Sequence, residues 1–164
     1  MTVVRDPQCA GQESVWDFPR PPVAVTCDKR IVIVHRGVTI ADTTNPVRTL
    51  ETSHPPTYYL PPADILMSAL QPVDGSSFCE WKGHARYFDV FVEGQLLTKA
   101  AWSYPAPTAK FDALRDHIAF YAHSFDTCLV EGEQVTPQPG GFYGGWITSD
   151  VSGPFKGVPG SRFW

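Results

Sequence analysis

Proline and glycine are spread along the whole chain, and they restrict its fold more than any other feature of the sequence. The 164 residues include 16 Pro and 13 Gly. Proline removes a backbone donor and clashes with the preceding helical turn, and glycine loses more backbone entropy than other residues when it is fixed in a helix. Long helices are therefore disfavoured, and we expect short strands joined by many turns.

The same hairpin pattern occurs three times. In each case a run rich in β-branched or aromatic residues precedes a residue pair that ends in Gly, and a second run follows. The Gly can adopt the positive φ that a tight hairpin turn needs. Three hairpins predict an antiparallel sheet system. The paired runs are 30–34 with 38–41, 87–92 with 95–98, and 128–130 with 133–135.

Two short helices are predicted, over residues 62–70 and 108–115. In the second, Thr108 would act as the cap, and Phe111 and Leu114 would face the core. A strand over 117–121 should follow. Since the hairpins outnumber the helices, more residues should be strand than helix, and the predicted fold class is all-β, mainly β with two short helices.

The N-terminal segment 1–22 mixes polar residues with Trp16, Phe18 and a proline-rich stretch. This composition is typical of an extended N-terminal arm whose aromatic rings dock on the domain. The predicted strands that follow make residues 23–136 the β-rich core domain. The chain length suits a single core with appended arms.

The segment 137–164 is rich in Gly, Pro and aromatic residues. It is too aromatic for a flexible linker, because burying a large side chain contributes roughly 1.5–3 kcal/mol. We expect an ordered C-terminal arm packed on the core, with Phe142, Tyr143 and Trp146 in contact with it.

Charge and hydropathy bear on location and partners. The net charge is −4, and Lys and Arg do not cluster, so nucleic acid is not an expected partner. No secretory signal or apolar run long enough for a membrane span is present, which favours a cytoplasmic protein with no membrane partner. Four widely spaced cysteines in a chain of this size predict reduced, unbridged thiols. An exposed strand edge in a small β domain would favour a homodimer.

The first candidate site lies around Glu51 and His54. Histidine titrates near neutral pH, and a carboxylate beside it can orient the imidazolium, so the pair could serve in acid-base catalysis. The alternative is a turn in which His54 satisfies backbone groups. Tyr58 and Tyr59 follow closely and could line a pocket.

The second candidate site is the run Cys79-Glu80-Trp81-Lys82. On a strand, Cys79 and Trp81 would share one face, and Glu80 and Lys82 the other, until Gly83 permits a turn. Lys82 could be an amine nucleophile or an anchor for an anion, or an exposed lysine paired with Glu80. Cys79 could be reactive or could be a small buried hydrophobe.

A third group of rings follows the second hairpin, where Trp102 and Tyr104 could share one face of a pocket or provide bulk in a β core. Metal chemistry has no support, because the sequence lacks Cys-x-x-Cys, His-x-His and His-Glu-x-x-His. Glu51-x-x-His54 has a metal-ligand spacing that requires a helix, which Pro55-Pro56 prevents. We therefore predict no metal and no cofactor.

Several of these motifs together resemble the family called domain of unknown function 427. They are 51–56, 58–59, 79–83, 101–105 and 141–150, and the resemblance covers about residues 14–164, including a C-terminal arm. It implies two antiparallel sheets packed like a tent, as a β sandwich similar to the ligand-binding domain of cereblon. Zinc often pins the sheets in those relatives, whereas this chain lacks the paired cysteines. The family is sometimes labelled a nucleotidyltransferase, but neither paired carboxylates nor a phosphate loop supports that chemistry here.

Two classes of function follow. The first is a small-molecule pocket lined by rings together with His54 and Lys82, which would prefer a ligand with an anionic or electrophilic end. The second is a small metal-independent enzyme that uses Glu51, His54 and Lys82. A non-catalytic module that binds a peptide or protein partner is a further alternative. Both pocket hypotheses predict that His54 and Lys82 face one cavity walled by at least two of Tyr58, Trp81, Trp102 and Tyr104.

Overall fold

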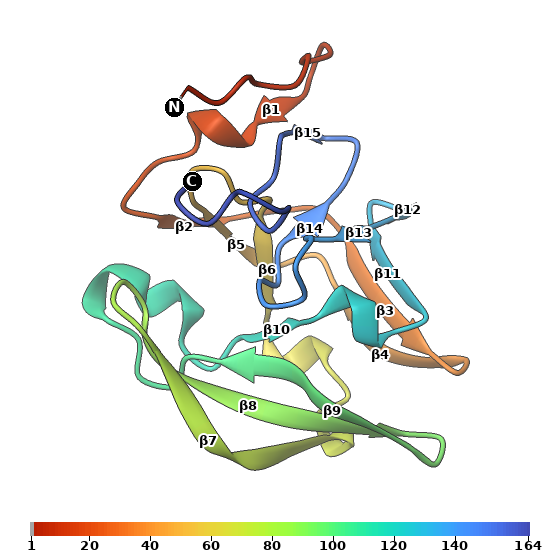
Figure 1. The fold of residues 1–164 in the computed structure, drawn as a ribbon. Coiled ribbons are helices and arrows are strands. Elements are labelled where there is room, and N and C mark those ends of the chain that lie inside the picture. The colour runs from red at the N-terminus through yellow and green to blue at the C-terminus, as the bar shows by residue number, and fades with distance from the viewer. Residues whose placement is uncertain (1) are drawn as a thin grey trace.

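The computed structural model describes residues 2–164 and is built mainly of antiparallel strands (Figure 1). Strands cover far more residues than helical turns, as predicted. The larger sheet has seven strands, in the order β2 (Val23–Thr26), β5 (Val47–Leu50), β6 (Thr57–Leu60), β10 (Ile118–Phe120), β9 (Gln95–Ser103), β8 (Gly83–Val92) and β7 (Leu70–Cys79). The smaller sheet has four, in the order β12 (Glu133–Gln134), β11 (Thr127–Val130), β3 (Ile31–His35) and β4 (Val38–Thr43).

The three predicted hairpins are confirmed as β3–β4, β8–β9 and β11–β12. In each two-residue turn both positions have positive φ, as a type I′ turn requires. The first position is Arg36, Glu93 or Glu131, with φ between 46° and 50°, and the second is always Gly. The glycine thus takes the less favourable of the two conformations without a steric cost. The predicted strand over 117–121 is confirmed as β10.

The predicted helix over 62–70 is wrong. The segment instead forms two 3-10 turns, η2 (Pro62–Asp64) and η3 (Met67–Ala69), and β7 already begins at Leu70. Between the turns the chain pairs with strand β4: Ile65 bridges Ala41, and the Leu66 N–H donates to the Ile40 carbonyl at 2.8 Å. A backbone engaged in strand pairing cannot continue a helix.

The predicted second helix is present as the 3-10 helix η4 (Ala109–Leu114), and its Phe111 and Leu114 are buried as expected. Thr108 is its N-cap residue, as predicted, but the side chain makes no capping hydrogen bond. The Thr108 hydroxyl instead donates to the Trp81 carbonyl at 2.6 Å and so ties η4 to the turn between β7 and β8. The other 3-10 helices are η1 (Val15–Asp17) and η5 (Ala122–Ser124).

The main hydrophobic core lies between the two large sheets. The smaller sheet contributes Ile31, Ile33 and Ile40, which are fully buried, and the larger sheet contributes Val90 and Phe120 among others. Along β3 the burial alternates residue by residue, as expected for a strand with one face on a core. Two sheets packed on one core form the predicted all-β sandwich.

The two terminal segments pair with each other and with the core. Strand β1 (Glu13–Ser14) runs parallel to β15 (Val151–Ser152), and β13 (Thr136–Pro137) pairs with β14 (Trp146–Ile147). Val15, Phe18 and Val151 form a small separate core. The N-terminal residue of the predicted arm 1–22, Met1, lies outside the described residues.

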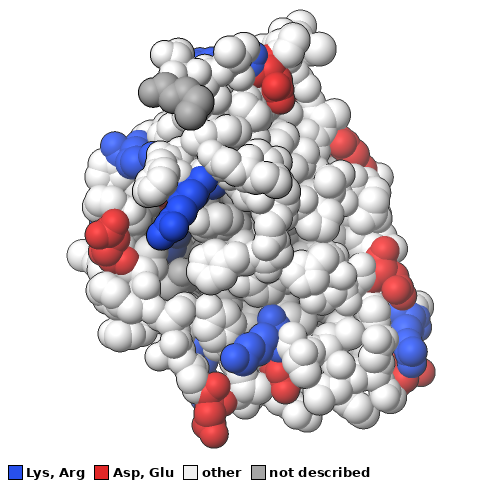
Figure 2. Space-filling view, viewed as in Figure 1, with Lys and Arg blue, Asp and Glu red and all other residues white. Residues whose placement is uncertain are grey.

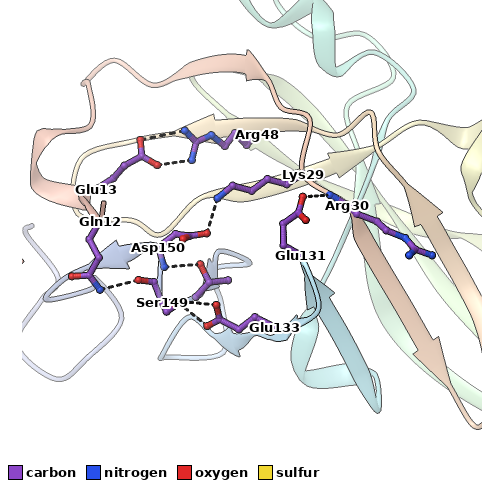
Figure 3. Close-up of polar contacts among 10 residues, drawn as sticks. Gln12, Glu13, Lys29, Arg30, Arg48, Glu131, Glu133, Ser149 and Asp150 are labelled. Atoms are coloured by element: carbon purple, nitrogen blue, oxygen red, sulfur yellow. Dashed lines mark hydrogen bonds and ion pairs between the residues drawn. The ribbon is translucent and has the colours of Figure 1, made fainter. Parts of the chain in front are cut away.

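Polar contacts fasten both segments to the body (Figure 3). Glu13 accepts two hydrogen bonds from the Arg48 guanidinium, at 2.8 and 3.2 Å. Asp150 pairs with Lys29 at 2.6 Å. The Gln12 amide donates to the Ser149 carbonyl at 2.9 Å, which joins the two segments directly. A carboxylate held by a guanidinium in two parallel bonds has a fixed orientation, so β1 has a defined position.

The C-terminal segment 137–164 contacts the body through only two of the three rings expected to do so. Trp146 is 2% exposed and donates from its indole N–H to the Phe120 carbonyl at 3.1 Å. Tyr143 packs edge-on against His54. Phe142 was expected to contact the body as well, but its side chain is 73% exposed and lies mostly in solvent. Its ring packs edge-on against Tyr143, with centroids 5.1 Å apart, and its carbonyl accepts from the Tyr121 hydroxyl at 3.2 Å.

The burial of Trp146 gives a stability test of the arm. Trp146→Ala should lower the free energy of unfolding by about 3–5 kcal/mol, because it leaves a large cavity and removes a hydrogen bond. Phe163→Ala is the matched control, since Phe163 belongs to the same segment and is 91% exposed. Urea denaturation followed by circular dichroism measures both. Equal midpoints for the two variants would show that the arm does not stabilise the body.

Candidate functional site

One face of the seven-stranded sheet carries a row of aromatic residues. Across the strands, Tyr59 pairs with Ala119, Ala119 with Trp102, and Trp102 with Tyr87. Residues directly opposite in antiparallel strands point to the same face, so the three rings lie on one side of the sheet. With Tyr104, Phe111 and neighbours they form a second buried cluster, separate from the main core.

Tyr58 lies on the opposite face. Adjacent residues on a strand point to opposite sides of a sheet, so β6 cannot place both Tyr58 and Tyr59 in one pocket. The Tyr58 ring packs against Trp146, with centroids 5.6 Å apart, and belongs to the main core. The expectation that Tyr58 lines the pocket is wrong.

A pocket of about 360 Å³ opens over the aromatic row. Its walls hold nine of the ten residues singled out from the sequence, all except Tyr58: Glu51, His54, Tyr59, Cys79, Glu80, Trp81, Lys82, Trp102 and Tyr104. His54 and Lys82 thus face one cavity, walled by three of the four expected rings. Their grouping agrees with the sequence analysis, while their roles stay predictions.

The end of β7 and the turn between β7 and β8 bring four of these residues to the pocket. Strand β7 ends at Cys79, so residues 80–82 form the turn and do not alternate between two faces as a continued strand would. Thr108 fixes this turn, because its N–H donates to the Lys82 carbonyl at 3.1 Å and its hydroxyl to the Trp81 carbonyl. Gly83 follows with φ of 108° and lies against the Ala106 carbonyl, where a side chain would crowd the backbone.

The Glu51–His54 segment is a tight turn, as the following prolines predicted. The His54 N–H donates to the Glu51 carbonyl at 3.0 Å. Glu51 Oε2 lies 3.8 Å from His54 Nε2, which is too long for a hydrogen bond. Glu51 also lies 3.7 Å from the guanidinium of Arg20. The two side chains are therefore neighbours without forming the hydrogen-bonded pair that acid-base catalysis would use.

The C-terminal segment closes the other side of the pocket with Gln138, Phe142, Tyr143, Gly144 and Lys156. Two adjacent glycines permit this approach. A Cβ on Gly144 would lie 2.0 Å from the Trp102 ring, and one on Gly145 would lie 2.6 Å from the Gln138 side-chain oxygen. Only a residue without a side chain fits at either position, so the glycines let the arm lie directly on the aromatic row.

The electrostatics of the pocket keep His54 neutral. Burial lowers the pKa of His54 to about 4, and the positive charges of Lys156, Arg20 and Lys82 add to the lowering. The ring contacts Tyr143 edge-on, with centroids 4.9 Å apart, and hydrogen-bonds to Gln138 at 3.0 Å.

The phenols of the pocket are also neutral. Burial raises the pKa of Tyr59 and of Tyr104 well above the usual value, and it raises the pKa of Tyr121 to about 12. At neutral pH the rings offer apolar faces and hydroxyl groups, and the charges of the pocket are those of Lys and Glu side chains. Lys82 lies over the Tyr104 ring at 6.0 Å, and Lys156 over the Tyr143 ring at 5.7 Å.

Comparison with known protein families identifies the family of this chain. A family model described as "Domain of unknown function (DUF427)" matches residues 23–131. The chain belongs to this family. No curated protein matches it. The DUF427 match covers most pocket residues, whereas the five from the C-terminal segment lie beyond it.

Four further features of this DUF427 protein concern metal ligands, cysteines, surface charge and helix length. No three His, Cys, Asp or Glu side chains among residues 2–164 lie together as a metal site would require. Cys9, Cys27, Cys79 and Cys128 are free. Figure 2 shows the Lys and Arg side chains of one face lying apart from one another. No helical segment in the described part of the chain is long and apolar enough to cross a bilayer.

Sequence reasoning missed several pocket residues of this DUF427 chain. Tyr87 could be assigned only once the β8–β9 register was known, because its neighbour in the row is Trp102. Gln138 and Lys156 lie in irregular segments, where no periodicity indicates direction. Tyr143 was expected to contact the body, and the sequence offered no reason to place it at the pocket.

The lowered pKa of His54 predicts how stability depends on pH. The unfolded ring takes up its proton near pH 6.5 and the folded ring near pH 4. Below pH 6.5 the unfolded state therefore binds more protons, and the free energy of unfolding falls by up to about 1.4 kcal/mol per pH unit until about pH 4. His54→Gln should remove this contribution, so that its urea midpoint falls less between pH 7 and 4.5 than that of the wild type.

The matched control is His84→Gln, on the exposed side of β8. It should keep the pH dependence of the wild type. Parallel curves for His54→Gln and wild type would contradict the assignment of a buried, neutral His54.

Proposed function

We propose that this protein binds a small molecule that has a flat apolar body and an anionic end. One observation carries the proposal: the pocket combines neutral aromatic walls with two lysine ammonium groups. Lys82 has no carboxylate partner within ion-pair distance among residues 2–164, and Lys156 donates to the main-chain oxygen of Trp164 at 3.2 Å. Lys82 and Lys156 are both half-buried. A half-buried ammonium is stabilised by an anion, and a ligand can supply it.

The aromatic walls of the pocket support the proposal that the ligand is flat. Trp102 and Tyr121 lie with ring centroids 4.5 Å apart, and Tyr59 and Tyr104 lie 6.2 Å apart. Rings held in fixed positions contact a planar apolar group at little entropic cost. The volume of about 360 Å³ is at the small end of the range for ligand pockets, which favours a compact ligand.

The distribution of charge in the pocket wall supports the proposal that the ligand has an anionic end. Of the two carboxylates in the walls, Glu51 faces Arg20 at 3.7 Å, so its charge is offset from outside the pocket. Glu80 alone then opposes Lys82 and Lys156. The balance inside the pocket is positive, and it favours a carboxylate or a similar anion over a cation.

The geometry favours ligand binding over a reaction in which Glu51 and His54 act as acid-base catalysts. A general base is most effective when its pKa lies near the working pH, and the pKa of His54 is about 4. The distance of 3.8 Å to Glu51 also leaves the ring without the carboxylate hydrogen bond that would raise its basicity.

Calorimetric titration with 2-naphthoate and its neutral analogue 2-naphthamide tests the proposal, because the two share a flat body and differ in charge. The acid should bind roughly tenfold or more tightly than the amide, since a charge-assisted hydrogen bond contributes about 1.5–3 kcal/mol. Lys82→Met and Lys156→Met should each reduce this preference.

Lys110→Met is the matched control, because Lys110 is exposed on η4 and does not line the pocket. It should leave both affinities unchanged. Equal affinity of the wild type for acid and amide, or an effect of Lys110→Met as large as that of Lys82→Met, would refute an anion-selective pocket.

A further inference from the structure

Gln138 is a buried amide at the junction of the C-terminal arm with the pocket. It is 4% exposed and follows β13. Its backbone N–H donates to the Gly145 carbonyl at 3.0 Å, which closes a loop over residues 138–145. Its side chain reaches the pocket wall and contacts His54, a residue 84 positions earlier in the chain.

The hydrogen bonds of the Gln138 side chain fix which way its amide points. The side-chain oxygen accepts from the Gly145 N–H at 3.1 Å, and the NH₂ group donates to the Lys156 carbonyl at 2.9 Å. A backbone N–H can only donate and a backbone carbonyl can only accept. Turning the amide over would set donor against donor and acceptor against acceptor, so only one orientation satisfies both backbone groups.

The same NH₂ group faces His54 Nδ1 at 3.0 Å. Because Gln138 donates there, Nδ1 must accept, and in a neutral imidazole the proton then resides on Nε2. Nε2 has no hydrogen-bond partner among the described residues, and it is not sealed from solvent. The ring therefore has a free N–H donor at the pocket.

We propose that Gln138 is a positioning residue that holds His54 as the Nε2–H tautomer, so that His54 donates a hydrogen bond to an acceptor oxygen of the bound ligand. This inference rests on the proposed binding function and extends it: an anionic end such as a carboxylate would accept from both a lysine and His54. The arm beyond the matched family region thus determines what His54 can do.

The charged groups around the ring support the neutral donor. Glu51 on the same turn places a carboxylate oxygen 3.8 Å from Nε2. Three cations on three other segments oppose a positive ring: Arg20 from the N-terminal segment, Lys82 from the β7–β8 turn and Lys156 from the C-terminal segment. Tyr143 covers one side of the ring. A positive charge on the His54 ring would meet more repulsion than attraction.

Nitrogen NMR of protein labelled with ¹⁵N-histidine tests the inference without any ligand. A protonated ring nitrogen and an unprotonated one have well-separated shifts, and their couplings to the ring protons distinguish Nδ1 from Nε2. At pH 7 the wild type should show His54 protonated at Nε2 and unprotonated at Nδ1. A proton on Nδ1, or a mixture of tautomers, would overturn the inference.

Gln138→Glu should reverse the hydrogen bond to His54 Nδ1, because a carboxylate can only accept a hydrogen bond. It should move the His54 proton to Nδ1 and raise the midpoint of the His54 titration by at least about one pH unit. Gln138→Met should leave a mixture of tautomers, since it neither donates nor accepts strongly. The matched control is Gln134→Glu, an exposed residue of β12, which should leave the His54 spectrum unchanged.

The NMR test of the His54 tautomer can fail or succeed independently of the binding test of the proposed function. The tautomer is read in the ligand-free protein, so failure of 2-naphthoate to bind would refute the binding function and leave the NMR result intact. If 2-naphthoate binds, Gln138→Glu should weaken it more than tenfold, whereas Gln134→Glu should not. A wild-type spectrum with the Nε2–H tautomer that persists in Gln138→Glu would show that Gln138 does not set it.

Discussion

The seven-stranded sheet has two faces, and the alternation of side chains along its strands decides what each face can do. One face, with Leu60 and Phe120, packs on the smaller sheet and forms the main core. The other, with Tyr59 and Trp102, carries the aromatic row below the pocket. A shift of one residue in any pairing would exchange these faces, so the core and the site depend on the same register. The main core thus stabilises the position of the pocket walls.

Much of this architecture can be predicted from local chemistry. The three hairpins follow from Gly at the second position of each turn, where positive φ is required. The segment 62–70 was mispredicted because its helical pattern competes with pairing to β4, which is a long-range interaction. Tyr58 belongs to the main core because strand alternation places it on the face opposite to Tyr59, and a pair of adjacent rings on one strand cannot line the same pocket. The residues of the pocket wall in irregular segments, above all Gln138, depend on tertiary contacts that no local pattern encodes.

The C-terminal arm gives the pocket a second wall of different chemistry. The sheet and the β7–β8 turn supply rings and Lys82, while the arm supplies Lys156 and the amide of Gln138. Gly144 and Gly145 let the arm lie on Trp102 and Pro55 without a gap. Anchoring by Trp146 and by the Asp150 pair with Lys29 holds this wall on the body. The pocket is therefore a composite of the DUF427 region and its C-terminal extension, and both parts supply residues of its wall.

The most direct test of the account is an NMR titration that follows the indole N–H signals of the five tryptophans while an aromatic carboxylic acid is added. Trp81 and Trp102 line the pocket, whereas Trp16 and Trp164 pack against each other and are not among the residues that line it. The account predicts that the signals of Trp81 and Trp102 shift in a saturable manner and that those of Trp16 and Trp164 stay fixed. Saturable shifts confined to Trp16 and Trp164, or no saturable shift of Trp81 and Trp102 with any aromatic acid tested, would contradict it.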